Sequence, residues 1–212
     1  MKRILILAAF AVTGSASANM ILNGSFEFNS AAINEYNLTN SAFSLLVSGV
    51  TGFGDSDEID LMNSNEYGPT ASDGIWKLGL HSKRDIAAVD AFSFDLNSGI
   101  VSGTEYVISF DAANVDDFDP NNGPIQIGIS NSANDFGTLV FSGTGGVDNW
   151  ISLSGSFVAN SDATYLTVRN DPSVSASWVH VDNFNLQAVP EPSSLLALGL
   201  LGLGLLARRK RG

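Results

Sequence analysis

The middle of this 212-residue chain consists of short runs of alternating apolar and polar residues, separated by Gly, Asn, Asp and Ser. Such alternation is typical of strands with one buried face, and no stretch between the two ends has the period of an amphipathic helix. About ten runs of this kind predict an all-β fold, a two-sheet jelly-roll sandwich. The expected strands are 20–28, 43–50, 76–82, 91–96, 105–112, 125–130, 138–142, 150–158, 164–169 and 178–187.

In the last of these runs the alternation slips phase near Asp182 and Asn183, which indicates a β-bulge. The longest stretch without a clear pattern is 52–75. A loop of that length in a compact domain usually carries a function or is ordered by a ligand, and the other interpretation is a solvated surface excursion. We interpret its acidic cluster as a solvated face rather than a site. The cluster consists of Asp55, Asp57, Glu58 and Asp60.

The N-terminal end has the three parts of a secretory signal peptide. Lys2 and Arg3 are followed by an apolar run over 4–12 and by the small-residue site Ala16-Ser17-Ala18. A permanent membrane anchor is the alternative, but the apolar run is short for a span. We therefore assign 1–18 to the signal peptide and expect the mature chain to begin at Asn19.

The C-terminal segment 189–212 also has three parts. Pro190-Glu191-Pro192 stays extended, because proline fixes its own φ and disfavours helix at the residue before it. A helix over 193–207 would be about 22 Å long, a marginal span of a hydrocarbon core of about 30 Å. A buried core helix would not be apolar all round with a basic block at its end. That block, which would remain in the cytoplasm by the positive-inside rule, is Arg208, Arg209, Lys210 and Arg211.

The triplet, the short transmembrane helix and the basic tail, in this order, resemble the PEP-CTERM sorting signal of Gram-negative bacteria. The resemblance implies passage through the inner membrane, brief anchoring by the C-terminal helix, and processing by an exosortase. It further implies a final place at the cell surface or in the extracellular matrix, where exopolysaccharide is the expected partner. It covers about a tenth of the chain and is silent on the activity of the middle.

The segment 19–188, which we take as the ectodomain, is strongly acidic. It has four basic side chains against twenty-one carboxylates, a net charge near −17. Such a domain is repelled by nucleic acid and by anionic membrane surfaces, so both classes of partner are excluded. The chain has no cysteine, which excludes disulfides, thiol catalysis and thiolate zinc sites.

Two stretches of the ectodomain carry a second resemblance. ILNGSFEF, residues 21–28, opens the mature chain and WVHVDNFNL, residues 178–186, closes it; ASDGIWKLGL (71–80) and VSGTEYVISFDA (101–112) have the same style. These segments resemble the galactose-binding-like jelly rolls, which include many carbohydrate-binding modules of secreted bacterial proteins. The resemblance implies that the first and last strands lie together and share a structural calcium ion.

The positions that match the calcium ligands are Glu27 and Asp182. Calcium takes six to eight oxygen ligands, and two neighbouring carboxylates repel unless a cation or proton lies between them. The alternative is that each carboxylate is exposed or accepts backbone hydrogen bonds. The acidic loop 117–123 begins like a calcium loop, but its glycine is one place late and position twelve is Gly128, so an Asx-turn loop is the better interpretation.

Sugar binding requires exposed aromatic faces beside amide and carboxylate groups. Tyr67, Trp76 and Trp178 are the candidate platforms, although Trp76 begins a strand and fits the core better than it fits a platform. No catalytic motif accompanies the only histidines, His81 and His180, so we predict that the protein is not an enzyme. The preferred hypothesis is a non-catalytic module that binds carbohydrate or exopolysaccharide. The alternative is a purely structural surface or matrix protein without a small ligand.

Overall fold

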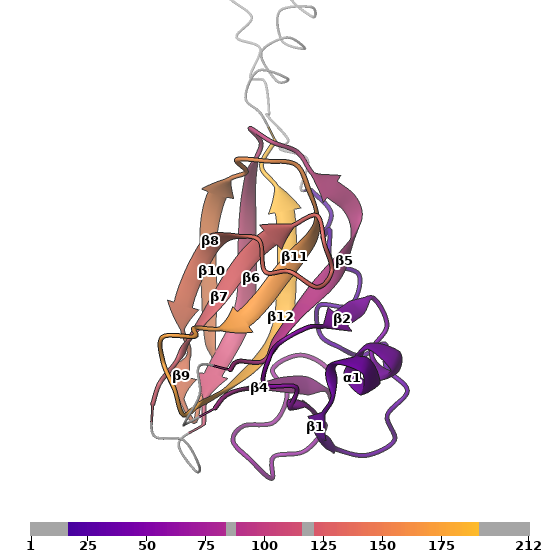
Figure 1. Cartoon of the computed structure of the whole chain (residues 1–212), viewed down its shortest axis with the longest axis vertical. Helices are drawn as coiled ribbons and strands as arrows, with labels where there is room; N and C mark the ends of the chain where they lie inside the picture. The colour runs from indigo at the N-terminus through magenta and orange to yellow at the C-terminus, as the bar shows by residue number, and fades with distance from the viewer. Residues whose placement is uncertain (1–16, 84–87, 116–120, 191–212) are drawn as a thin grey trace, which may run out of the picture. The chain divides into compact units, whose positions relative to one another are not determined.

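The computed structural model of the chain describes residues 17–83, 88–115 and 121–190 (Figure 1). Within these residues the strands form two sheets, with the order β1-β3-β4-β12-β6-β10 in the first, where β9 also pairs with β6, and β2-β5-β11-β7-β8 in the second. The elements are β1 (Glu35–Leu38), α1 (Asn40–Leu46), β2 (Val50–Gly52), β3 (Ile59–Met62), β4 (Lys77–Ser82), β5 (Ala91–Ile100), β6 (Glu105–Asn114), β7 (Pro124–Ser130), β8 (Thr138–Thr144), β9 (Gly146–Val147), β10 (Ile151–Val158), β11 (Ala163–Asn170) and β12 (Ser177–Ala188). The predicted all-β jelly-roll sandwich is confirmed.

A cluster of aromatic rings fills the space between the two sheets. Phe110 of β6 stacks on Phe184 of β12 with ring centroids 4.9 Å apart, and Phe92 and Phe94 of β5 meet Phe184 from the opposite sheet. Phe26, from the opening segment, contacts Phe92, Phe94 and Phe184. Offset and edge-to-face contacts of this kind add to the free energy gained by burying the rings.

The predicted bulge in β12 is confirmed. Its register against β6 shifts between Asp182 and Asn185, and Asn183 has a φ of 55°. Before the bulge Val181 points into the core, and after it Phe184 does. The bulge lets two differently phased halves of one strand bury their apolar side chains in the same core.

The opening segment runs beside β12 but is irregular, not the strand expected over 20–28. The N–H of Met20 donates to Leu186 O at 2.8 Å, and the N–H of Phe184 donates to Gly24 O at 2.9 Å. A Cβ on Gly24 would lie 2.1 Å from Phe184 O, so only glycine permits this approach. The first and last segments of the unit Asn19–Ala188 therefore do lie together.

Two other expectations about secondary structure were wrong. The stretch 43–50 is not a strand, because α1 begins after the N-cap Thr39, whose side chain accepts a hydrogen bond from Ala42 N. Phe43 and Val47, four residues apart, are buried on one side of this helical turn. The stretch 52–75 is not one loop, because its first half contains β3, which pairs with β1 and β4.

The compact unit that holds both sheets and the core is Asn19–Ala188. Most of the predicted signal peptide, most of the sorting tail and much of the acidic loop 117–123 lie outside the described residues. In the described part of the chain, no helix is both long enough and apolar enough to cross a membrane.

Candidate functional site

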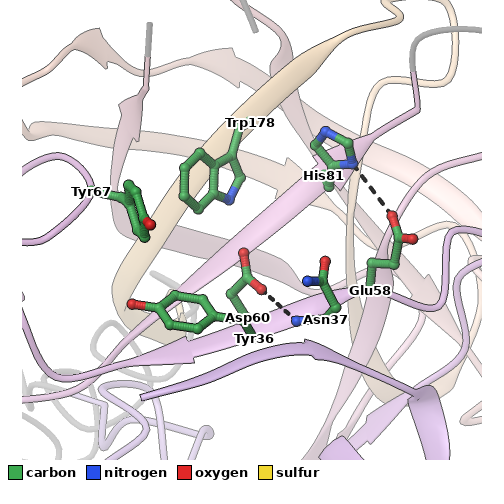
Figure 2. A pocket seen from close by; sticks show the side chains of 7 residues that line it. All are labelled: Tyr36, Asn37, Glu58, Asp60, Tyr67, His81 and Trp178. Atoms are coloured by element: carbon green, nitrogen blue, oxygen red, sulfur yellow. Dashed lines mark hydrogen bonds and ion pairs between the residues drawn. The ribbon is translucent and has the colours of Figure 1, made fainter. Parts of the chain in front are cut away.

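The first sheet carries polar and aromatic side chains on the face that points away from the core. Successive residues of a strand face opposite sides, so Leu61, Leu80 and Val179 enter the core while their neighbours Asp60 and Trp178 lie on the outer face. At one end of this face is a cavity of about 430 Å³ (Figure 2). It is lined by Tyr36, Asn37, Glu58, Asp60, Tyr67, His81 and Trp178.

Three aromatic rings from three separate segments form one side of this cavity. Tyr36 comes from β1, Tyr67 from the loop after β3, and Trp178 from β12. The Tyr36 and Tyr67 rings are 5.7 Å apart at 80°, and the Tyr67 and Trp178 rings are 5.5 Å apart at 52°. Since neither pair is stacked in parallel, the rings present faces in different directions, as Figure 2 shows.

Asp60 is the acidic group nearest to these rings in Figure 2, where its carboxylate lies between Tyr36 and Trp178. It accepts a hydrogen bond from the backbone N–H of Asn37 at 2.7 Å and is only 7% exposed. Burial raises the pKa of Asp60 to about 7, and the hydrogen bond from Asn37 opposes part of this rise. The space for both Asp60 and Trp178 depends on Gly79 of β4, where a Cβ would lie 2.6 Å from Trp178 Nε1.

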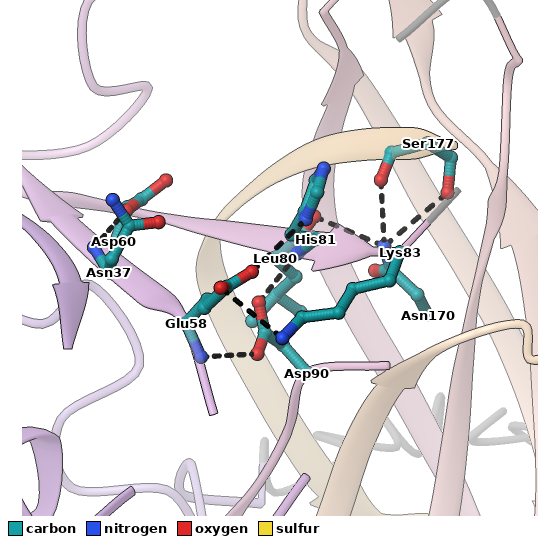
Figure 3. A network of polar contacts seen from close by, with 9 residues as sticks. All are labelled: Asn37, Glu58, Asp60, Leu80, His81, Lys83, Asp90, Asn170 and Ser177. Atoms are coloured by element: carbon teal, nitrogen blue, oxygen red, sulfur yellow. Dashed lines mark hydrogen bonds and ion pairs between the residues drawn. The ribbon is translucent and has the colours of Figure 1, made fainter. Parts of the chain in front are cut away.

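The opposite side of the cavity is an ion-pair network (Figure 3). Glu58 lies 3.6 Å from Nδ1 of His81 and 3.2 Å from Nζ of Lys83. Asp90, which is fully buried, holds the backbone beneath this network by accepting from Glu58 N at 3.0 Å and His81 N at 2.7 Å. Burial raises the pKa of Asp90 to about 6, an effect that these two hydrogen bonds reduce.

Farther along the same face, the segment 67–76, which we call the covering loop, lies against the sheet. Nζ of the fully buried Lys77 donates to Tyr67 O at 3.0 Å and to Pro69 O. Trp150 Nε1 donates to Thr70 O at 2.7 Å. These bonds reach main-chain atoms of the loop, so they fix its path whatever side chains it carries.

The two predicted calcium ligands hold the other end of the covering loop. Glu27 accepts from the N–H groups of Ile75 and Trp76, both at 2.8 Å. Asp182 accepts from Ser72 N at 2.8 Å and Asp73 N at 3.0 Å, and also from Ser72 Oγ and Asn183 N. Burial raises the pKa of Asp182 to about 7, against the effect of these hydrogen bonds.

This arrangement is the alternative considered above, in which both carboxylates accept backbone hydrogen bonds. The N–H donors present their positive ends to the oxygens, whereas a calcium shell needs oxygen atoms around the ion. Among the described residues no group of three or more His, Asp or Glu side chains is placed to hold a metal ion. The shared calcium ion stays a prediction from the resemblance, and no step of the function proposed below depends on it.

Of the three predicted sugar platforms, the structure brings Tyr67 and Trp178 together in the cavity. Trp76 lies instead in the main core between the sheets and is not among the residues that line the cavity, which corrects its candidacy. Sequence reasoning missed the remaining lining residues. Asp60 and Glu58 were assigned to a solvated face, and Tyr36 lies in a strand that was not predicted.

The C-terminal segment 188–211 matches the PEP-CTERM protein-sorting motif. The chain is therefore an exported protein with a C-terminal sorting signal, of the kind that an exosortase processes. In class it is an exported two-sheet jelly roll with an aromatic and acidic cavity on one sheet. No curated protein matches the chain significantly in sequence.

Among solved structures, arabinose-bound MgGH51 α-L-arabinofuranosidase matches with a TM-score of 0.54 and 13% identity, over 83% of this chain and 27% of that one. The chain thus spans about a quarter of that enzyme, and the likeness is one of fold. The CBM22-1 xylan-binding domain of Paenibacillus barcinonensis Xyn10C gives 0.48 and 16%, over 84% and 99% of the two chains. TmCBM61 in complex with β-1,4-galactotriose gives 0.44 and 16%, over 82% and 100%.

Proposed function

We propose that this exported sandwich is a non-catalytic carbohydrate-binding module, and that its cavity is the binding site. The observation that carries the proposal is the convergence of the three rings with the carboxylate of Asp60 in one open cavity. Sugar rings pack their C–H faces on aromatic rings, while carboxylate and amide groups accept and donate the directional hydrogen bonds of hydroxyls. A cavity of about 430 Å³ has the size of typical small-ligand sites.

Binding without catalysis is the better assignment for the two cavity carboxylates. Glycoside hydrolysis commonly uses one carboxyl as acid and the other as nucleophile or base. Glu58 is engaged with Lys83 and His81, and Asp60 is held by Asn37 N. Both therefore have partners that favour a fixed, binding role.

The sorting signal suggests where such a module would act. We propose that it is delivered to the surface or extracellular matrix of a Gram-negative cell, with exopolysaccharide as the polymer it meets there. A non-catalytic module in that place would attach the protein to the polymer. The strong negative charge of the domain favours uncharged or cationic polymers over acidic ones.

The test is a glycan array followed by isothermal titration with Asn19–Ala188, the unit that contains both sheets and the complete core. Binding should fall at least tenfold in Trp178→Ala. The matched control is Tyr165→Ala, on β11 of the other sheet, which should bind like the unaltered protein. Absence of any glycan ligand would reject the proposal and leave the purely structural matrix role.

A further inference from the structure

The cavity has an excess of negative charge over positive charge in its wall. Asp60 and Glu58 both line it, and Glu66, outside the lining, accepts a hydrogen bond from the hydroxyl of the lining residue Tyr36 at 3.0 Å. His81 is the one lining residue that can carry a positive charge, and its Nδ1 lies 3.6 Å from the carboxylate of Glu58. Lys83, outside the lining, lies 3.2 Å from the same carboxylate. In the described part of the chain Asp60 makes no ion pair with either group, although the charge of His81 acts on it at longer range.

A carboxylate with little access to water is stabilised when a cation takes the place of the lost hydration. Aromatic faces attract the same cation through their quadrupoles, most strongly when the site is shielded from water. Tyr36, Tyr67 and Trp178 provide three rings around one side of the cavity in which Asp60 provides the charge (Figure 2). This combination suits an ammonium group better than a hydroxyl.

We infer that the cavity takes a protonated amine carried on a sugar, so that the ligand is a glycan containing amino sugars with free amines. This inference rests on the proposed function and narrows it to one class of glycan. Sugars with carboxylate groups are excluded by the same charges, because Asp60 and Glu58 would repel them. Acetylated amino sugars lose the cation and keep only the contacts of a neutral sugar with the rings.

The acidity of Asp60 is consistent with this role. Its pKa is raised to about 7, mainly by burial and in smaller part by the charge of Asp90, while the hydrogen bonds from Asn37 and Trp178 and the charge of His81 oppose the rise. A bound ammonium would shift the same carboxyl toward the ionised form, since opposite charges favour each other. Glu58 and Lys83 also face this part of the site and largely offset each other.

The test compares three β-1,4-linked trisaccharides of equal length by isothermal titration at pH 6.5. They are the glucosamine trimer, its fully N-acetylated form and cellotriose. We expect the glucosamine trimer to bind at least tenfold more tightly than the other two. Asp60→Asn should remove this preference, so that within this variant the glucosamine trimer and cellotriose bind with affinities within about threefold of each other. Choline, a cation without a sugar, serves as a further probe and should bind at least tenfold more weakly than the glucosamine trimer.

Matched variants separate the site from the general negative charge of the domain. Asp55→Asn removes the same charge at an exposed position outside the cavity lining and should keep the preference for the amine. Tyr36→Ala, at a ring that is 37% exposed and therefore tolerant of truncation, should reduce the preference at least threefold. This second variant keeps the test valid if Asp60→Asn fails to fold.

The outcomes distinguish the amine inference from the proposed carbohydrate binding on which it rests. Equal affinity for the three trisaccharides would overturn the amine inference and leave carbohydrate binding intact. An equal loss of preference in Asp55→Asn and Asp60→Asn would overturn it too, because diffuse attraction would then explain the binding. Choline binding as tightly as the glucosamine trimer would overturn the assignment to a sugar. Failure of every trisaccharide and every arrayed glycan to bind would reject both statements.

Discussion

Two buried aspartates on the same outer face of the first sheet have similar acidity and different surroundings. Burial raises the pKa of both Asp60 and Asp182 to about 7. Asp182 has four hydrogen bonds to its carboxylate and lies under the covering loop, whereas Asp60 accepts from Asn37 N and lines an open cavity. A raised pKa therefore does not by itself mark a binding site. Asp60 is distinguished by its position in the lining of an open cavity, beside the indole of Trp178, which also hydrogen-bonds to it.

The largest expected effect is loss of the lysine beneath the covering loop. Lys77→Met should lower the free energy of unfolding by about 3 kcal/mol, because it leaves two loop carbonyls and the neighbouring charge of Asp182 without their cation. Urea unfolding measures this change. Lys83→Met, which removes a partly exposed ammonium paired with Glu58, should cost under about 1 kcal/mol. Equal costs would contradict the special role of the covering loop.

The next largest effect is expected when the same substitution is made at each of the two aspartates. Asp182→Asn should destabilise the fold by about 2 kcal/mol, because an amide offers one acceptor oxygen where the carboxylate uses two. Asp60→Asn should cost less than about 1 kcal/mol and act mainly on ligand binding. Parallel unfolding and titration experiments on both variants measure the contrast. A larger loss of stability in Asp60→Asn would reverse our assignment of the two residues.

The dependence of stability on pH should follow the buried carboxyls. Asp60, Asp90 and Asp182 keep their protons up to about pH 6 to 7 in the folded protein, while the unfolded chain releases them near pH 4. Their contribution is thus complete below pH 4 and is lost as the pH rises through 7. His180 has the opposite effect on stability. Burial lowers its pKa, so below about pH 6.5 the unfolded chain binds a proton at this residue that the folded protein does not bind, and stability falls.

Three carboxyls outweigh one imidazole, so unfolding at pH 8, 6.5 and 5 should show stability increasing toward pH 5. The lowered pKa of Lys77, about 8, acts mainly above this range. Asp60→Asn and Asp182→Asn should each make the profile flatter. A profile that falls between pH 8 and 5 would contradict the burial of these carboxyls as protonated groups.

The smallest effect on stability is expected in the cavity rings. Tyr36→Ala should change the free energy of unfolding by less than about 0.5 kcal/mol, because Tyr36 is 37% exposed and lies outside the main core. The same variant should bind the sugar about fivefold more weakly, in the range expected for a lost aromatic contact. A variant that loses stability but keeps its affinity would place Tyr36 with the covering loop rather than with the binding site.

The fold could be predicted because most strands alternate cleanly, and the bulge could be predicted because a phase slip is visible in one strand. β3 could not, since all four of its residues are buried and therefore show no alternation. The helix α1 has only seven residues, and the buried pair Phe43 and Val47, its C-cap, fits either interpretation.

The cavity could be predicted only in part for a related reason. Tyr67 and Trp178 are recognisable as aromatic residues near polar ones, but 110 positions separate them in the chain. Asp60 is buried because β3 lies between β1 and β4, and a sequence read residue by residue gives no sign of that position. A long unpatterned stretch was the available signal, and both acidic lining residues lie within it.

β12 has Trp178 near its start and leads into the sorting segment at its end, with β4 on one side and β6 on the other. If the tail is tethered and the cavity holds a polymer, mechanical tension passes along this strand over about 30 Å, at about 3.3 Å per residue. Tension along a strand loads its flanking ladders in shear, so many hydrogen bonds share the force at once. A central strand, hydrogen-bonded on both sides, is therefore well suited to carry force between a bound glycan and a cell envelope.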